Sequence, residues 1–219
     1  MKKITLLIIF SLLNSFNLFS AEEDVEEIVI IGSQIKGAKI TGALPVTVIS
    51  SEDIDVIGAA DGDELIDNLV EQGMNFFNEN EQVSGGVNAA RGDVGAYNLR
   101  NMGVGNTLSL LNGRRLVNNA GYQTEYIGGD FVPTLTVNTN SIPVNGLDRL
   151  EVLKDGASAL YGADAVAGVV NNVLDNDFVG TRMQFRSGGI ESLDAKDNTF
   201  SVKHGMDLNG GKTNVSVFF

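Results

Sequence analysis

Few side chains in this chain are suited to catalysis or metal binding, and they stand far apart. The 219 residues include no cysteine and one histidine, His204. Zinc sites are built mainly from cysteine and histidine, and a serine triad needs a histidine base. His204 lies in an alternating segment near the C-terminus, where we expect it to face an interface or a lumen. Asp175 and Asp177 could contact a cation, although a charged turn in solvent is the favoured interpretation.

Two short motifs imitate catalytic or nucleotide-binding loops. The run GASAL at 156–160 resembles a nucleophile elbow but lacks the closing glycine. The run GGKT at 210–213 resembles the end of a phosphate loop, but Met206 stands where the first glycine is required. No strand-loop-helix context follows it. The sequence therefore predicts a protein that is not an enzyme and that holds no cofactor and no metal.

The charge balance excludes some partners. The chain has 28 acidic and 15 basic residues, a formal net charge of −13. Without residues 1–21, which hold two lysines and no acid, 28 acidic and 13 basic residues leave −15. An acidic chain argues against nucleic acid or anionic phospholipid as a partner. The 26 glycines and 43% hydrophobic residues indicate a folded, loop-rich protein that forms one domain, or one domain and the start of another.

The N-terminus has the order of a secretory signal peptide. Lys2 and Lys3 precede an apolar run over residues 4–13, and small residues follow at Ser20 and Ala21. The apolar run is too short to remain as a membrane-spanning helix. We predict that residues 1–21 are removed on export, with the exact cleavage position left open.

Residues 142–174 carry the most specific pattern in the chain. Apolar and charged residues are interspersed around Leu150, Val152 and Leu153, which predicts a half-buried strand. A turn at Asp155-Gly156 and a helix-compatible run follow, and the next strand covers residues 166–174. Asn171 and Asn172 in that strand suit a sheet face that meets water or a polar wall. The predicted order is strand, turn, helical turn, strand.

A second specific segment spans residues 99–117. Asn112-Gly113 separates two short apolar runs, and this is the strongest local signal for a β-hairpin. Both segments resemble the plug signatures of TonB-dependent outer-membrane receptors. The second segment departs from the usual pattern by having Asn101 in place of a glycine and Asn112 in place of an aspartate. Both changes leave the turn geometry possible.

The resemblance implies an α+β fold, in which a plug with a small mixed β-sheet and short helices sits inside a transmembrane β-barrel. At the motif positions, charged residues are expected to pair with the barrel wall, and glycines permit tight turns. Ordinary surface solvation is the alternative for the charges. The motif residues are Arg100, Gly103, Asn112, Gly113, Arg114, Arg115, Arg149, Glu151, Lys154, Asp155, Gly156, Tyr161, Gly162 and Asn171.

An apolar island close to the N-terminus resembles the TonB box. Glu27 ends an acidic run and Ile28, Val29, Ile30 and Ile31 follow it. An extended apolar segment in a charged, glycine-rich surrounding suits strand addition to the sheet edge of a partner. The resemblance implies that TonB captures this segment. An ordinary first strand of the domain is the alternative.

The region between the box and the hairpin predicts a strand over residues 45–49 and two helices. The first helix starts at Ser50 or Ser51 and ends at Gly58. The second starts with a capping box at Asp61 and Glu64 and ends at Gly73. Its apolar residues are expected in the core, namely Leu65, Ile66, Leu69 and Val70.

Two long polar loops are predicted, over residues 73–95 and 118–141. In the receptor family, such plug loops face the outside and contact the substrate. The second loop carries Tyr122, Tyr126 and Phe131, which are therefore candidate substrate contacts. A solvent-exposed loop without a ligand role is the alternative.

Apolar and polar residues alternate over 181–187, 199–204 and 214–219. Such alternation is typical of barrel strands with one face in lipid, and also of a soluble antiparallel meander. After the plug signatures we favour the barrel. Because a barrel that holds a plug needs about 22 strands, we expect the chain to be the front part of a receptor.

The sequence thus predicts residues 1–21 as signal peptide, 22–38 as a flexible segment with the TonB box, 39–178 as plug and 179–219 as the start of a truncated barrel. The function implied is energised uptake of a scarce nutrient across the outer membrane of a Gram-negative cell. The implied partners are TonB with its inner-membrane energising complex, outer-membrane lipid, and a siderophore, cobalamin, oligosaccharide or peptide. The alternative is a soluble periplasmic binding module without a barrel.

Overall fold

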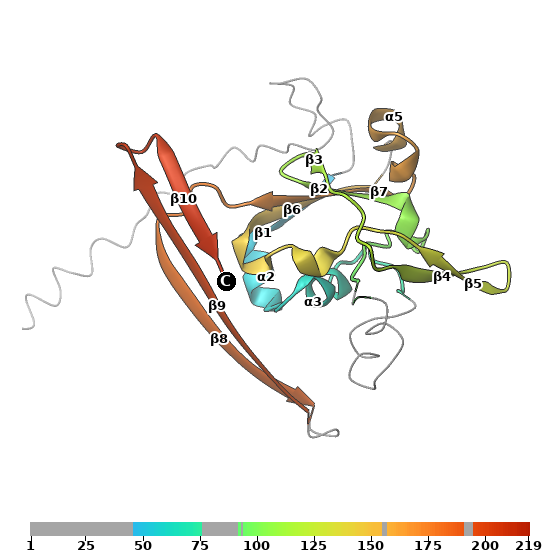
Figure 1. Cartoon of the computed structure of the whole chain (residues 1–219), viewed down its shortest axis with the longest axis horizontal. Helices are drawn as coiled ribbons and strands as arrows, with labels where there is room; N and C mark the ends of the chain where they lie inside the picture. The colour runs from blue at the N-terminus through green and yellow to red at the C-terminus, as the bar shows by residue number, and fades with distance from the viewer. Residues whose placement is uncertain (1–45, 76–91, 93, 155–156, 191–194) are drawn as a thin grey trace, which may run out of the picture.

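The structure is a computed structural model, and it describes residues 46–75, 92, 94–154, 157–190 and 195–219. The predicted signal peptide, the TonB box and most of the loop at 73–95 lie outside these residues. None of the helices in the described ranges is long and apolar enough to cross a membrane. Two bodies of secondary structure lie beside each other (Figure 1), a sheet with helices and a separate sheet of long strands.

The first body, called the sheet domain here, is built on a five-stranded mixed sheet with the order β1-β6-β7-β2-β3. The strands are β1 (Val46–Ser50), β2 (Thr107–Leu111), β3 (Arg114–Arg115), β6 (Leu147–Leu153) and β7 (Gly168–Leu174). β6 runs antiparallel to both β1 and β7, whereas β2 and β7 are parallel. The predicted small mixed sheet with short helices is confirmed.

The first predicted helix is present as α2 (Ser51–Ile57). The Ser50 hydroxyl accepts the N–H of Asp53 at 3.2 Å, and the Asp53 carboxylate accepts the N–H of Ser50 at 3.0 Å. This reciprocal capping box satisfies two of the orphan donors at the helix start. Gly58 ends the helix in the left-handed conformation, with φ of 70°.

The second helix, α3 (Gly62–Asp67), starts as predicted but ends early. The Asp61 carboxylate accepts the N–H of Glu64 at 3.0 Å. The Asn68 side chain donates to the Glu64 carbonyl at 2.7 Å, so it occupies the acceptor that a continuing helix would use. The predicted end at Gly73 is therefore wrong. Val70 lies beyond the helix and is 95% exposed, so its predicted place in the core is also wrong.

The predicted order of strand, helical turn and strand after residue 142 is confirmed. α5 (Ala157–Tyr161) lies between β6 and β7, and Asp155 and Gly156 are outside the described residues. Short 3-10 turns complete the connections: η3 (Val104–Asn106), η4 (Thr139–Ser141), η5 (Val144–Gly146) and η6 (Ala163–Ala165).

The core covers both faces of the sheet, and β6 lies in its middle. Leu150 and Val152 pack in the cluster that contains α2 and α3, and Leu153 packs in the cluster around α5. All three side chains are fully buried, and so is Glu151. The prediction of a half-buried strand is therefore wrong, because β6 has strand neighbours on both sides and side-chain layers on both faces.

The predicted loop over residues 118–141 contains a two-stranded hairpin, which corrects its assignment as a loop. β4 (Gln123–Ile127) pairs antiparallel with β5 (Asp130–Thr134). Gly128 and Gly129 form the turn with positive φ of 64° and 100°. Only glycine adopts such a pair of values at no steric cost, so the Gly-Gly pair between residues of strand type was the available signal.

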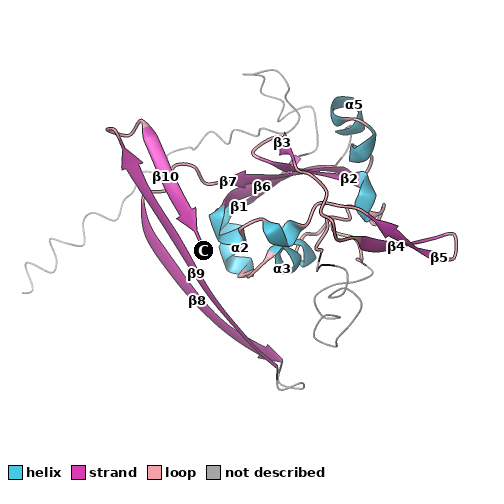
Figure 2. Cartoon of the chain, in the orientation of Figure 1, coloured by secondary structure: helices cyan, strands magenta, loops and turns pink. Residues whose placement is uncertain are grey.

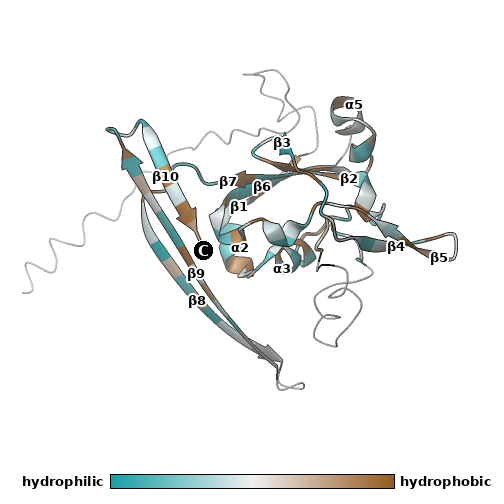
Figure 3. Ribbon diagram, in the orientation of Figure 1, coloured by the Kyte–Doolittle hydropathy of each residue, from teal (hydrophilic) through white to brown (hydrophobic). Residues whose placement is uncertain are grey.

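The second body, called the C-terminal sheet here, has three antiparallel strands in the order β10-β9-β8. They are β8 (Gly180–Ile190), β9 (Ala195–Leu208) and β10 (Thr213–Phe218). All three predicted strands are confirmed: β8 and β9 are longer than predicted, and β10 is shifted by one residue. The long strands curve past the end of the sheet domain that carries α2 and α3 (Figure 2). Teal and brown residues alternate along them (Figure 3).

Leu69 and Val70, which follow the end of α3, allow a direct test of which side chain packs in the core. Leu69 is 5% exposed and Val70 is 95% exposed. We expect Leu69→Ala to lower the free energy of unfolding by about 2–4 kcal/mol, because it leaves a cavity. Val70→Ala is expected to change it by less than about 0.5 kcal/mol. Urea unfolding in detergent, followed by circular dichroism, measures both. Equal losses would show that Val70 is buried like Leu69, as the sequence suggested.

Candidate functional site: the buried polar network and the strand interface

Glu151 is the centre of a buried polar cluster that gathers several of the predicted motif residues. Its carboxylate accepts the Nε–H of Arg149 and the Nδ2–H of Asn171, each at 2.9 Å. The Asn171 amide oxygen accepts the N–H of Gly113 at 2.8 Å. Because a buried carboxylate is costly unless it is paired, these contacts hold β6, β7 and the β2–β3 turn in one arrangement.

A second buried network lies beside it. The Tyr97 hydroxyl donates to the Asn172 amide oxygen at 2.8 Å, and the Asn172 amide donates to the Leu110 carbonyl at 3.0 Å. Burial raises the pKa of Tyr97, so the phenol stays protonated and acts as a donor. The sequence predicted that Asn171 and Asn172 meet water or a polar wall. Both side chains are buried away from water, and their partners are polar groups of the sheet domain itself. Nothing in the local sequence pointed to Tyr97.

The turn between β2 and β3 has the predicted geometry. Asn112 and Gly113 have φ of 48° and 74°, as a two-residue hairpin turn requires. The Asn112 amide oxygen also accepts the N–H of Leu174 at 2.8 Å, so this asparagine ties the turn to β7.

Arg100 ties its loop to the ends of two strands. Its Nη2 donates to the carbonyls of Lys154 and Ala167, both at 2.8 Å. Arg100 and Asn101 have positive φ of 56° and 57°, and asparagine tolerates this conformation better than most residues. Gly103, with φ of 98°, completes the loop. The departure from glycine at position 101 therefore leaves the turn intact.

Lys154 forms an ion pair with Glu71 at the same edge of the sheet domain. Burial raises the pKa of Glu71, but the hydrogen bond from Lys154 and other contacts outweigh this effect and leave the pKa below its usual value. Glu71 lies outside the two motif segments and was not predicted.

Arg115 joins β3 to the segment after α5. Its guanidinium contacts the Asp164 carboxylate and the Tyr161 carbonyl. The hydrogen bond from Arg115 lowers the pKa of Asp164. Gly162 lies between these two partners in sequence and has φ of 101°. Arg114 is exposed on β3. The partners named for these motif charges lie within the sheet domain, so pairing with a barrel wall stays a prediction.

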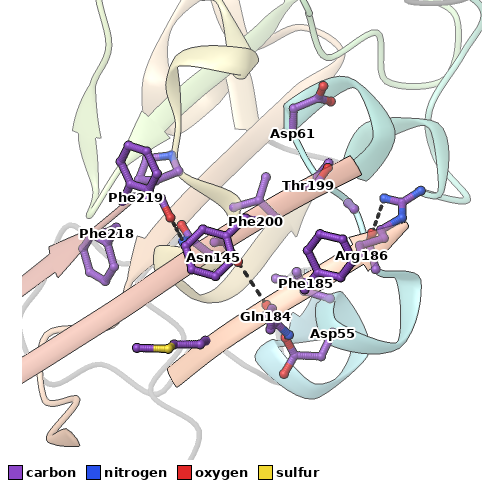
Figure 4. Close-up of a pocket in the computed structure, with 18 of the residues that line it drawn as sticks. Asp55, Asp61, Asn145, Gln184, Phe185, Arg186, Thr199, Phe200, Phe218 and Phe219 are labelled. Carbon is purple, nitrogen blue, oxygen red and sulfur yellow. Dashed lines mark hydrogen bonds between the residues drawn. The ribbon is translucent and has the colours of Figure 1, made fainter. Parts of the chain in front are cut away.

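The C-terminal sheet contacts the sheet domain through charges that the sequence analysis did not single out. On β8, Arg182 pairs with Asp55 of α2. Arg186 pairs with Glu64 of α3, with 3.1 Å between its Nη2 and Oε1. Arg186 also donates to the Gly58 carbonyl. Figure 4 shows Arg186 and Gln184 reaching from β8 toward the helices. The sequence shows that both arginines alternate with apolar residues, but their acidic partners lie more than 100 residues away in the chain.

Lys203 of β9 makes the most enclosed of these contacts. Its side chain is 7% exposed, and its Nζ lies 2.5 Å from the Asp175 carboxylate. The ammonium also lies 4.5 Å from the centre of the Phe178 ring, which is the range of a cation–π contact. Asp175 therefore pairs with a buried cation of the chain, and the favoured interpretation of it as a solvated charged turn is wrong.

A cleft of about 690 Å³ separates the two bodies next to these ion pairs. Asn145 spans it by donating to the Phe219 carbonyl at 2.9 Å (Figure 4). Its titratable lining residues among those described are Asp55, Asp61 and Arg186. Among these described lining residues, no nucleophile lies beside a base. The described residues contain no group of three histidine or carboxylate side chains that could hold a metal ion.

His204 lies on the opposite face of the C-terminal sheet. Its Nδ1 is 2.7 Å from the Thr181 hydroxyl, and the pair is exposed.

The predicted substrate-contact residues lie on or beside the β4–β5 hairpin. The rings of Tyr126 and Phe131 are 5.3 Å apart, and both side chains are more than half exposed. Tyr122 lies half-buried just before β4. The structure thus brings two of the three residues together, and their contact with substrate stays a prediction.

The sequence matches the model of one protein family, the TonB-dependent Receptor Plug Domain, over residues 38–169. The match covers more than half of the chain. The chain belongs to this family. The sheet domain is therefore called the plug below.

Relatives and solved structures agree with the family. The vitamin B12 transporter BtuB of Vibrio vulnificus (strain CMCP6) is 36% identical over 80 residues, which are 34% of this chain and 12% of the transporter. The ferric enterobactin receptor PfeA of Pseudomonas aeruginosa has the same fold with a TM-score of 0.56 and 19% identity, over 80% of this chain and 24% of the receptor. The siderophore receptor PirA of Acinetobacter baumannii gives a TM-score of 0.56 and 20% identity, over 82% and 24%. This chain thus spans an eighth to a quarter of the length of these proteins.

Two carboxylates that contact Arg149 allow a matched test of the buried cluster. Glu151 is fully buried, whereas the Asp148 side chain is 44% exposed. We expect Glu151→Gln to lower the free energy of unfolding by about 3 kcal/mol, because it leaves the Arg149 charge poorly compensated in the interior. Asp148→Asn should cost less than about 1 kcal/mol. Urea unfolding of both variants measures the difference, and similar losses would contradict a central role for Glu151.

The Glu64–Arg186 pair predicts how stability depends on pH. Burial raises the pKa of Glu64, but hydrogen bonds from Arg186 and the Ala60 N–H outweigh it and leave the pKa below its usual value. A lowered carboxyl pKa stabilises the folded state above the unfolded pKa of about 4.3, and this contribution is lost as the pH falls through the folded value. We therefore expect Glu64→Gln and Arg186→Met to lose less stability than the parent between pH 6 and pH 3. An unchanged slope for both variants would argue against the pair.

Proposed function

We propose that this chain supplies the plug and the first barrel strands of a TonB-dependent outer-membrane receptor for a scarce nutrient. The observation that carries the proposal is the set of ion pairs from one face of the C-terminal sheet to the plug. Arg182, Arg186 and Lys203 all lie on this face and reach Asp55, Glu64 and Asp175. A strand wall with a charged face against a plug is the arrangement that a plugged barrel needs.

The other face of the C-terminal sheet supports contact with lipid. Met183, Phe185 and Phe200 are 68%, 71% and 53% exposed, and Val217 is 61% exposed. β8 and β9 have 11 and 14 residues, and a tilted strand of about 9–11 residues crosses a bilayer. Exposed apolar residues on one face and charged residues on the other are typical of barrel strands in an outer membrane. The same face argues against a soluble periplasmic module, because it would leave large apolar side chains in water.

The mechanism we infer is mechanical gating. Substrate binds from outside, TonB captures the box at Glu27–Ile31 by strand addition, and force from the inner-membrane complex moves the plug so that the lumen opens. The Asp55–Arg182 and Glu64–Arg186 pairs are partly exposed, and exposed pairs contribute little net stability. These pairs hold the plug against the strands of the C-terminal sheet, but breaking them costs little free energy. The buried Glu151 cluster keeps the sheet intact during the movement.

The export route and the substrate follow from the same family. The predicted signal peptide at residues 1–21 and an outer-membrane location are consistent with strands that bear an apolar outer face. The relatives carry the names of vitamin B12 and siderophore receptors, so a small nutrient is the expected cargo. In this function the site residues make contacts, and none of them performs a chemical reaction.

Coupling to TonB can be tested by capture of the full chain on the immobilised C-terminal domain of TonB. We expect Ile30→Pro to reduce capture at least tenfold, because proline removes a backbone donor from the added strand. Ile35→Pro, which makes the same change outside residues 27–31, is the matched control and should bind like the parent. Equal capture of the parent and of Ile30→Pro would end the assignment of the box.

A further inference from the structure

A second cleft lies away from the strand interface, between the loop of residues 98–106 and the β4–β5 hairpin. Its volume is about 420 Å³, which is within the usual range for a small-molecule site. Its walls include side chains from the Arg100 loop and from β4. The proposed gating mechanism does not use this cleft, so its chemistry is independent information about the cargo.

The cleft is rich in amide groups, and some of them keep unused hydrogen-bonding capacity. Asn98 is committed to the fold, because it accepts the N–H of Gly103 and donates to the Met74 carbonyl. The Asn106 amide nitrogen donates to the Met102 carbonyl at 2.7 Å, and no bond to its amide oxygen is found among the described residues. Asn101 likewise has no bonded partner for its amide nitrogen within the described chain. A ligand thus meets both a donor and an acceptor.

Among the described residues that line the cleft, the charge is negative. Glu125 is half-buried, and its Oε1 accepts the N–H of Gly105 at 3.1 Å. No lysine or arginine is among the described residues that line the cleft. Arg100 belongs to the adjacent loop, but its guanidinium is bound to the carbonyls of Lys154 and Ala167. From the described lining, an anionic ligand would therefore meet like charge and no compensating cation.

An aromatic face completes the site. Tyr126 lines the cleft, and its side chain is 61% exposed. Phe131 packs against it across the hairpin, with the ring centres 5.3 Å apart, and holds the ring in place. An exposed, supported ring offers a flat apolar surface next to polar groups that fix orientation.

We propose that this cleft binds a neutral, hydroxyl-rich solute, a saccharide, and disfavours an anionic iron chelate. Alternating hydroxyl groups match the amide donor, the amide acceptor and the carboxylate, and the apolar face of a sugar ring matches Tyr126. Ferric catecholate chelates carry net negative charge, which Glu125 repels. The inference rests on the proposed uptake function and names the class of its cargo.

The test uses the full chain refolded in detergent, with circular dichroism as a check of folding. The probes are an array of neutral oligosaccharides of glucose, mannose and N-acetylglucosamine, with ferric enterobactin as the anionic comparison. We expect saturable binding of at least one neutral saccharide and at least tenfold weaker binding of ferric enterobactin. Tyr126→Ala should weaken saccharide binding at least tenfold. Glu125→Gln should reduce the difference in affinity between neutral saccharides and ferric enterobactin. Asp130→Asn, which removes one charge from the same hairpin outside the cleft, is the matched control and should leave this difference unchanged.

Three outcomes would overturn the proposal: no neutral saccharide binds, ferric enterobactin binds more tightly than every saccharide, or Tyr126→Ala binds like the parent. Capture of the same samples by the C-terminal domain of TonB reports separately on the uptake function. Retained capture with any of these outcomes would leave the transport proposal standing and reject only the saccharide.

Discussion

The burial of one carboxylate, that of Glu151, constrains the rest of the plug. β6 can hold a charged side chain in the middle of the sheet only if a cation and hydrogen-bond donors reach it. Arg149 on the same strand and Asn171 on the neighbouring strand supply them. The Asn171 amide oxygen in turn accepts the backbone N–H of Gly113 in the β2–β3 turn. The register of three strands and the position of the Asn112-Gly113 turn therefore depend on one charge that has no access to water.

The plug and the C-terminal sheet are joined by a different kind of contact. Inside the plug, the polar groups around Glu151 and Tyr97 are buried and hydrogen-bonded, so separating them would leave unpaired polar groups in the interior. Between the two bodies, arginines of β8 meet acidic side chains of α2 and α3 that remain partly exposed. Water replaces such contacts at low cost. The molecule thus combines a plug that resists deformation with a surface from which it can separate.

Local signals predicted the elements whose geometry depends on neighbouring residues. The Asn-Gly turn, the Asp61 cap at the start of α3 and the alternation in the last three strands all depend on backbone geometry a few residues away. The failures have tertiary causes. Val70 lies outside the core because the Asn68 side chain caps α3 before residue 70. Glu151 is buried because β6 has a neighbouring strand on each side. The partners of Asp55, Glu64 and Asp175 are more than 25 residues distant, so no local pattern reveals them.

Lys203 makes one end of the contact between the plug and the C-terminal sheet harder to separate than the other. Its ammonium lies under the Phe178 ring and against Asp175, where the chain leaves the plug, and it is far less exposed than Arg182 or Arg186. Breaking this contact would leave a buried ammonium group without its carboxylate partner, which is costly in free energy. Breaking the arginine pairs costs less, because water can solvate their exposed charges. If the plug moves away from the strands, α2 and α3 would therefore separate first. The chain segment that enters β8 would stay attached and act as the hinge.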